Sequence, residues 1–217
     1  MGRLDSQREY WDTAGTTKTF GYPLEIGWLD QVPRDAPVLD YGCGYGRLTA
    51  ELTGQGLTAV EGVDVSPALV GRARDEHPGL RFAVLDDPPH LAHPDGSFAA
   101  ALLFAVLTCV PGDDAQRGLV AELRRVLRPG GLLYVSDLPL QDDERNRERY
   151  DRFAGRHGTY GVFETDDGAV LRHHTAEWLR ALFEGFDTVR ERELDARTMN
   201  GRPVRAVQLL LRKRVAA

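Results

Sequence analysis

One stretch constrains the fold of this chain more than any other: the segment from Val38 to Leu48, VLDYGCGYGRL. An apolar run opens it, glycine then occupies every second position from 42 to 46, and an apolar-periodic segment follows. Glycine lets a backbone turn sharply and leaves no Cβ between the turn and a ligand. A helix that begins directly after such a turn points its free N–H groups at that ligand. The segment therefore predicts a strand, a ligand-binding turn and a helix.

The rest of the chain predicts a regular alternation of strands and helices. Further strands are expected at 59–64, 81–85, 98–104, 132–135, 188–198 and 204–211. Asn200-Gly201 is a strong hairpin turn between the last two, residues 141–156 predict a charged helix, and residues 159–174 contain the signal of a smaller hairpin. This order predicts an α/β fold: a doubly wound, mostly parallel seven-stranded sheet with a terminal antiparallel hairpin, a helical N-terminal lid and a small inserted hairpin.

The glycine segment, read with Asp40, forms the pattern Asp-x-Gly-x-Gly-x-Gly and resembles the first motif of class I S-adenosylmethionine (SAM) methyltransferases. A dinucleotide fingerprint would instead read Gly-x-Gly-x-x-Gly. An acidic residue at the end of the second strand and Arg-Pro-Gly-Gly before the fifth fit the same family. The resemblance implies a single domain, 1–217, with a helical lid at 1–35, a SAM-binding core at 36–137 and a substrate-side region at 138–217.

Acidic residues at strand ends are the clearest cofactor candidates. Asp64 ends the second strand, where a doubly wound nucleotide site needs an acceptor for ribose hydroxyls; the alternative is a loop or helix-cap aspartate. In the family, an acid after the third strand meets the adenine amine, and both Asp86 and Asp87 qualify, with Asp86 preferred. The other expected cofactor-binding residues are Tyr10, Trp11, Asp40, Gly42, Gly44, Gly46, Val65 and Phe104.

The acceptor side is expected in the region after residue 138. His173 is the preferred general base because its ordinary pKa lies near neutral pH, and the alternative is a surface histidine. Tyr160 is the second catalytic candidate, and an amine acceptor needs no base at all. Other candidates at this pocket are Phe163, Glu164, Arg172 (alternatively a surface ion pair) and the Thr198-Met199-Asn200 turn.

Charge and composition exclude several classes. The net charge of −6 gives no basic field for nucleic acid or anionic membrane. Acids interleave the arginines from Arg145 to Arg156, which favours an ion-paired, solvated helix over a phosphate-binding face. The two cysteines and six histidines show no metal-ligand spacing, so no metal is expected. No apolar run approaches membrane-spanning length, which favours a cytoplasmic protein; the oligomeric state is left open.

These observations predict a SAM-dependent methyltransferase that acts on a small molecule. The methyl group would pass directly, by in-line displacement, to an O, N or C nucleophile, leaving S-adenosylhomocysteine. One alternative is a catalytically inactive SAM-binding module. The other is an NAD(P)-linked oxidoreductase, against which the glycine spacing and the absence of a Tyr-x-x-x-Lys pair argue.

Overall fold

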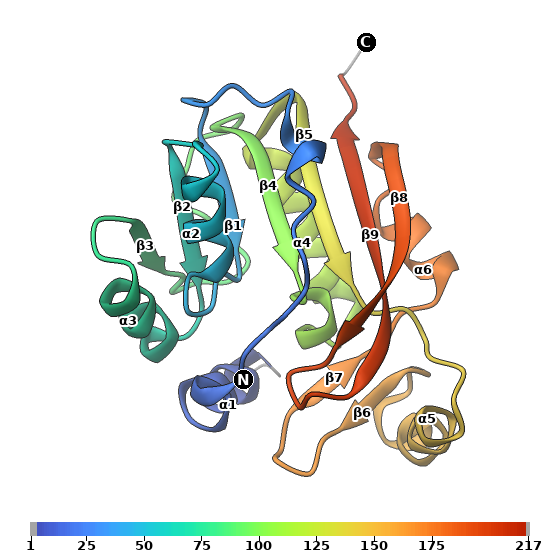
Figure 1. Cartoon of the computed structure of the whole chain (residues 1–217). Coiled ribbons are helices and arrows are strands. Elements are labelled where there is room, and N and C mark those ends of the chain that lie inside the picture. The colour runs from blue at the N-terminus through green and yellow to red at the C-terminus, as the bar shows by residue number, and fades with distance from the viewer. Residues whose placement is uncertain (1–3, 216–217) are drawn as a thin grey trace.

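A seven-stranded sheet forms the centre of the computed structural model, which describes residues 4–215 (Figure 1). Its strand order is β3-β2-β1-β4-β5-β9-β8. The strands are β1 (Val38–Tyr41), β2 (Val60–Asp64), β3 (Arg81–Val84), β4 (Phe98–Phe104), β5 (Leu127–Asp137), β8 (Phe186–Arg197) and β9 (Pro203–Lys213). The first five strands in this order, β3, β2, β1, β4 and β5, are parallel, whereas β9 is antiparallel to both β5 and β8. The predicted doubly wound sheet with a terminal antiparallel hairpin is confirmed.

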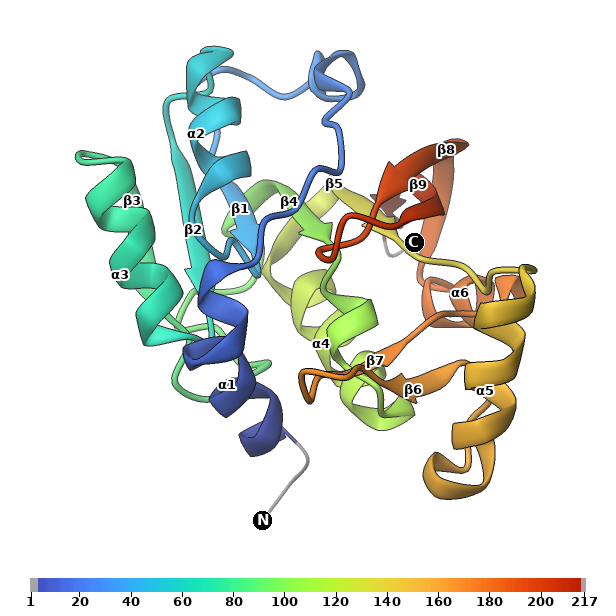
Figure 2. The same cartoon turned by 60° about the horizontal axis from the view of Figure 1, so that its bottom comes forward.

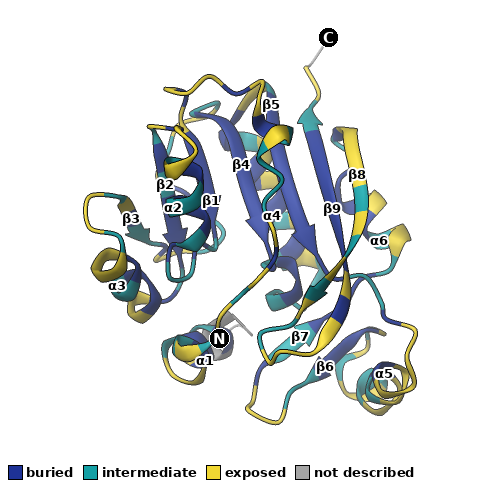
Figure 3. Ribbon diagram, in the orientation of Figure 1, coloured by how far each residue is buried: buried dark blue, intermediate teal, exposed yellow. Residues whose placement is uncertain are grey.

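The central strands are apolar because both faces of the sheet are covered. Every residue of β4 is buried, and Ala100 pairs with both Val38 of β1 and Leu132 of β5. Figure 3 shows the buried centre of the sheet and the more exposed edge strand β8. The chain leaves β1 toward β2 on one side and returns to β4 on the other. This reversal creates the crevice at the strand ends where such sheets bind ligands.

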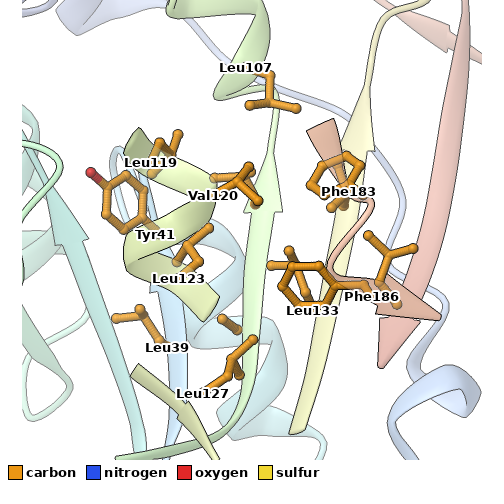
Figure 4. Packing of buried hydrophobic residues seen from close by; sticks show 14 of the residues in the cluster. Leu39, Tyr41, Leu107, Leu119, Val120, Leu123, Leu127, Leu133, Phe183 and Phe186 are labelled. Atoms are coloured by element: carbon orange, nitrogen blue, oxygen red, sulfur yellow. The ribbon is translucent and has the colours of Figure 1, made fainter. Parts of the chain in front are cut away.

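Helices cover both faces of the sheet. α2 (Arg47–Gly54) packs with the N-terminal segment, including the 3₁₀ helix η2 (Ile26–Leu29), on one face. α4 (Asp113–Val126) and α6 (Ala176–Leu182) pack on the other, where Leu123 and Phe183 contact the strands (Figure 4). α3 (Pro67–Glu76) lies against β2 and β3. None of the helices in the described part of the chain is long and apolar enough to cross a bilayer.

Helix starts agree with the sequence at one position and differ at another. Ser66 caps α3 as its pattern predicts, and its hydroxyl accepts the N–H of Leu69 at 3.1 Å. Asp113 and Gln116 resemble a capping box, but the N-cap of α4 is Gly112 and no side chain caps the helix. Gln116 is buried and its carboxamide instead donates to the carbonyls of Leu107 and Val110. A tertiary polar network has replaced the local cap.

The remaining elements gather at the carboxyl ends of the parallel strands (Figure 2). They are α1 (Leu4–Asp12), the 3₁₀ helices η1 (Ala14–Thr17) and η3 (Leu107–Cys109), α5 (Glu144–His157) and the hairpin of β6 (Val162–Glu164) and β7 (Val170–Arg172). Residues 1–3 of the predicted lid and residues 216–217 of the predicted substrate-side region lie outside the described part of the chain. The division at 35/36 and 137/138 stays a prediction.

Candidate functional site

The glycine turn after β1 has a backbone that only glycine adopts without strain. Gly42, Gly44 and Gly46 have φ of +75°, +54° and +82°. A Cβ added to Gly44 would meet no protein atom within 4 Å, so this position faces open space. The turn therefore presents bare backbone to a cavity.

Asp64 closes the same turn from the end of β2. Its two carboxylate oxygens accept the N–H groups of Gly44 and Ser66, each at 2.9 Å. The side chain is 8% exposed, and burial raises its pKa above the ordinary value. Each carboxylate oxygen has a further lone pair, so the group can still accept ligand hydroxyls. The carboxylate thus keeps acceptor capacity beside the turn, and its role toward a ribose stays a prediction.

A cavity of about 410 Å³ opens beside this turn. The expected cofactor residues that line it are Trp11, Gly42, Gly44, Asp64, Val65, Asp86, Asp87 and Phe104. Asp86 and Asp87 are both exposed, and the nearest basic groups are Arg8 at 3.7 Å from Asp86 and His90 at 3.5 Å from Asp87. Which of the two meets adenine stays a prediction.

Tyr10, Asp40 and Gly46 do not line this cavity. Tyr10 is buried and its hydroxyl donates to Asp167 at 3.1 Å. Asp40 lies beneath the turn, accepts the Thr49 hydroxyl at 2.7 Å, and has its pKa raised to about 6 by burial. Gly46 is the N-cap of α2. These residues support the turn and the lid, and the structure gives them no direct contact with the cavity.

An apolar wall of the cavity was not anticipated from the sequence. It comprises Leu69, Leu85, Pro88, Pro89, Val106, Val110 and Leu119. Prolines predict only an irregular chain after β3, yet Pro88 and Pro89 line the cavity together with Asp86 and Asp87. The sequence signal that could have indicated this apolar wall is the pair of prolines directly after the acidic end of β3.

A second cavity, of about 620 Å³, adjoins the first. Phe20, Tyr22, Ala105 and Cys109 line both cavities. The apolar context of Cys109 in the sequence favours a place in the helix core, but the residue lies at this junction, and its thiol donates to the Ala105 carbonyl at 3.2 Å. Burial raises the pKa of the thiol well above its usual range. The thiol is therefore protonated at neutral pH and unsuited to nucleophilic attack.

His173 lines the second cavity, but not as an exposed base. The ring is 2% exposed, and its Nδ1 lies 2.6 Å from the Tyr150 hydroxyl. That hydroxyl accepts the N–H of Gln141 at 3.2 Å, so donating its own proton to Nδ1 satisfies both groups. Burial lowers the pKa of His173 well below its ordinary value. The neutral ring then carries its proton on Nε2, where it donates, in contrast to the general-base role expected from the sequence.

The other acceptor-side candidates separate into two groups. Glu164, Phe163 and the 198–200 turn line the second cavity. Tyr160 lies outside both cavities, is 46% exposed, and packs edge-on against Tyr150. Arg172 also lies outside them; it is buried and pairs with Asp113 at 2.6 Å. The ion pair anticipated for Arg172 thus exists, beneath the surface instead of on it.

The arginines of α5 differ from the ion-paired, solvated face that their sequence favours. Among the residues described, Arg156 is the only one of them with an ion pair, to Glu164 at 3.1 Å. Arg145, Arg149 and Arg152 recur at helical spacing and line the second cavity. The helix therefore turns three arginines toward the cavity, with Glu148 as the one acid of the helix beside them.

Within residues 4–215, no three His, Cys, Asp or Glu side chains converge as a metal site would require.

Comparison with known proteins identifies the core. Residues 39–135 match the family described as "Methyltransferase domain". The chain is 38% identical over 122 residues to the 2-methyl-6-phytyl-1,4-hydroquinone methyltransferase of Synechocystis sp., covering 55% of this chain and 37% of that protein. It is 32% identical over 155 residues to the carboxy-S-adenosyl-L-methionine synthase of Chromohalobacter salexigens, covering 64% and 56%. The chain thus spans about half the length, or less, of these relatives.

A solved SAM-dependent methyltransferase from Methanosarcina mazei has the same fold, with a TM-score of 0.82 and 24% identity over 91% of this chain and 100% of that one. The glycine turn, Asp64 and β1 to β5 all fall within or beside the matched region. Residues 39–135 of this chain therefore match a methyltransferase domain, and the chain shares the fold of a solved SAM-dependent methyltransferase.

Proposed function

We propose that this chain transfers a methyl group from SAM to an O, N or C nucleophile of a small molecule by direct in-line displacement. The observation that carries the proposal is the pair of adjoining cavities. One adjoins the glycine turn and Asp64, the other adjoins α5 and the inserted hairpin, and they share Phe20, Tyr22, Ala105 and Cys109 as common walls. Two reactants held in such cavities meet at that junction.

The residues of the first cavity fit SAM. The open position at Gly44 leaves room for a ligand to lie against the turn, and Asp64 supplies a partly satisfied carboxylate for ribose hydroxyls. Trp11, Val65, Phe104 and either Asp86 or Asp87 complete the binding surface in this proposal. When bound, SAM supplies an electrophilic methyl group on a sulfonium centre.

The protein's part at the junction is to position the acceptor and to exclude water. The junction is aromatic and apolar, and burial raises the pKa of Tyr22 and of Cys109, so both stay protonated and neutral. None of the described residues shared by the two cavities is a strong base, which suits a nucleophile that attacks before losing its proton. Tyr22 is 2% exposed, and its hydroxyl has no hydrogen-bond partner among the residues described, so it is available to orient an acceptor.

Substrate choice is assigned in this proposal to residues 138–217 together with the N-terminal segment. α5, the β6–β7 hairpin and the 198–200 turn contribute most of the second cavity. The hydroquinone named for the Synechocystis relative is a small molecule, and the net charge of −6 is consistent with such an acceptor over a nucleic acid.

The test is calorimetric titration with SAM, S-adenosylhomocysteine and NAD, followed by turnover with radiolabelled SAM and a panel of phenols, amines and carboxylic acids. Binding of SAM with methyl transfer to a panel member supports the proposal. Binding of SAM without transfer to any panel member supports an inactive binding module. Preference for NAD overturns the proposal.

A further inference from the structure

Arg149 occupies an unusual position for a cation. Its guanidinium carbon lies 3.5 Å from the centre of the Phe163 ring and 5.6 Å from that of Tyr150. Its Nε is enclosed and has no hydrogen-bond partner in the described part of the chain. Burial is the main cause that lowers the pKa of this arginine, and the neighbouring Tyr150 hydroxyl and Asp143 offset it only in part. A desolvated cation without a counter-ion is costly unless another group compensates for the lost water.

Acidic side chains that line the same cavity do not compensate Arg149. Glu164 is held by Arg156 and His157, each at 3.1 Å. Asp167 is held by Lys18 at 2.6 Å. Glu148 and Asp166 are exposed and form no ion pair with any described residue. The cationic residues that line the cavity and form no ion pair within the described part of the chain are Arg145, Arg149, Arg152 and Arg202.

A second donor lies beside Arg149. His173 packs against the same Phe163 ring at 5.0 Å, and the Tyr150 hydroxyl places its remaining proton on Nε2. Nε2 has no partner among residues 4–215, and it is not one of the enclosed, unsatisfied atoms, so it reaches the cavity. A guanidinium and a neutral imidazole N–H on one wall are complementary to an anion with several acceptor oxygens. The rest of the lining includes Leu138, Phe153, Leu171, Met199 and Val204.

We infer that the methyl acceptor carries a carboxylate, which Arg149 and His173 bind at the α5 wall of the second cavity while an apolar body extends to the junction. This inference rests on the proposed function and names its substrate class. The carboxylate serves as an anchor, because the residues that bind it do not line the first cavity. The methylated atom lies elsewhere on the acceptor, next to Phe20, Tyr22 and Cys109.

The experiment measures binding of matched acids and amides in the presence of S-adenosylhomocysteine. The probes are phenylacetate, 4-phenylbutanoate and octanoate, each compared with its carboxamide by calorimetry. At least one carboxylate is expected to bind about tenfold or more tightly than its amide. Arg149→Gln should abolish that preference, and Arg149→Lys should retain part of it. Arg147→Gln is the matched control, since Arg147 lies on the same helix, is exposed and does not line the cavity.

A second measurement needs no ligand. Arg149→Met removes a half-buried cation whose Nε is unpaired and keeps an unbranched apolar side chain over Phe163, so the Tm of the free protein should rise, whereas Arg147→Met should leave it unchanged. A purely structural role for Arg149 predicts a fall instead. Equal affinity for acids and amides, absence of any carboxylate binding, or equal effects of Arg149→Gln and Arg147→Gln overturns the inference. Titration of each protein with SAM separates this result from failure of the proposed function, because Arg149 does not line the SAM cavity.

Discussion

Replacing Asp64 by Asn tests the cofactor site most directly. The substitution keeps the side-chain shape and one oxygen but removes the charge and places an NH₂ group where the second acceptor was. In the native protein both oxygens already accept backbone N–H groups, from Gly44 and Ser66. The amide therefore leaves one of these donors facing another donor, and it offers less to a ribose hydroxyl. A hydrogen bond to a charged group contributes about 1.5–3 kcal/mol.

We expect the Kd for S-adenosylhomocysteine to rise by about 10- to 150-fold, which is that energy converted at 1.4 kcal/mol per factor of ten. Isothermal titration calorimetry measures it, and circular dichroism checks the fold. Asp40→Asn is the matched control: Asp40 is a buried acid at the end of the neighbouring strand, but it contacts Thr49 and not the cavity. An unchanged Kd for Asp64→Asn, or an equal loss for Asp40→Asn, would refute the assignment of Asp64.

Three further outcomes are expected. Gly44→Val should abolish SAM binding, because its side chain enters the space beside the turn, and should lower the Tm only through backbone strain at φ +54°. Gly46→Val should lower the Tm further, since its Cβ would also lie 2.7 Å from the Phe82 ring. Asp167→Asn removes the ion pair with Lys18 and weakens the bond from Tyr10, so hydrogen exchange in 7–18 and 165–170 should accelerate, and unchanged protection would contradict this link between lid segments. Burial lowers the pKa of His174 to about 3. Between pH 6.5 and 3 the unfolded chain therefore binds a proton that the folded chain does not, and the free energy of unfolding decreases as the pH is lowered. Adjacent Asp137, whose pKa burial raises to about 7, acts in the opposite sense. Denaturant titrations should therefore show His174→Gln gaining stability relative to the native protein by up to about 1.4 kcal/mol per pH unit as the pH falls through this window; parallel curves would show that His174 does not carry the effect.

The sequence and the structure disagree most about α5. Interleaved acids and arginines indicate a solvated face by their spacing, and the helix does form where that pattern predicts it. Whether a given arginine is paired depends on which face of the helix carries it and what that face contacts. Packing of α5 against the β6–β7 hairpin decides which face that is. Arg149 consequently lies over Phe163 while Arg147, two positions away, is exposed.

What the sequence by itself determined is the sheet, the glycine turn and the acids at the ends of β2 and β3. Apolar strand patterns and glycines at left-handed positions are local properties, and parallel strands bring their carboxyl ends to one edge without further information. Only the tertiary structure decided which polar side chains pair. Tyr150 with His173, Tyr10 with Asp167 and Gln116 with Trp178 join residues far apart in sequence. Such pairs depend on the relative placement of whole elements, and that placement decides which donors remain free to meet an acceptor.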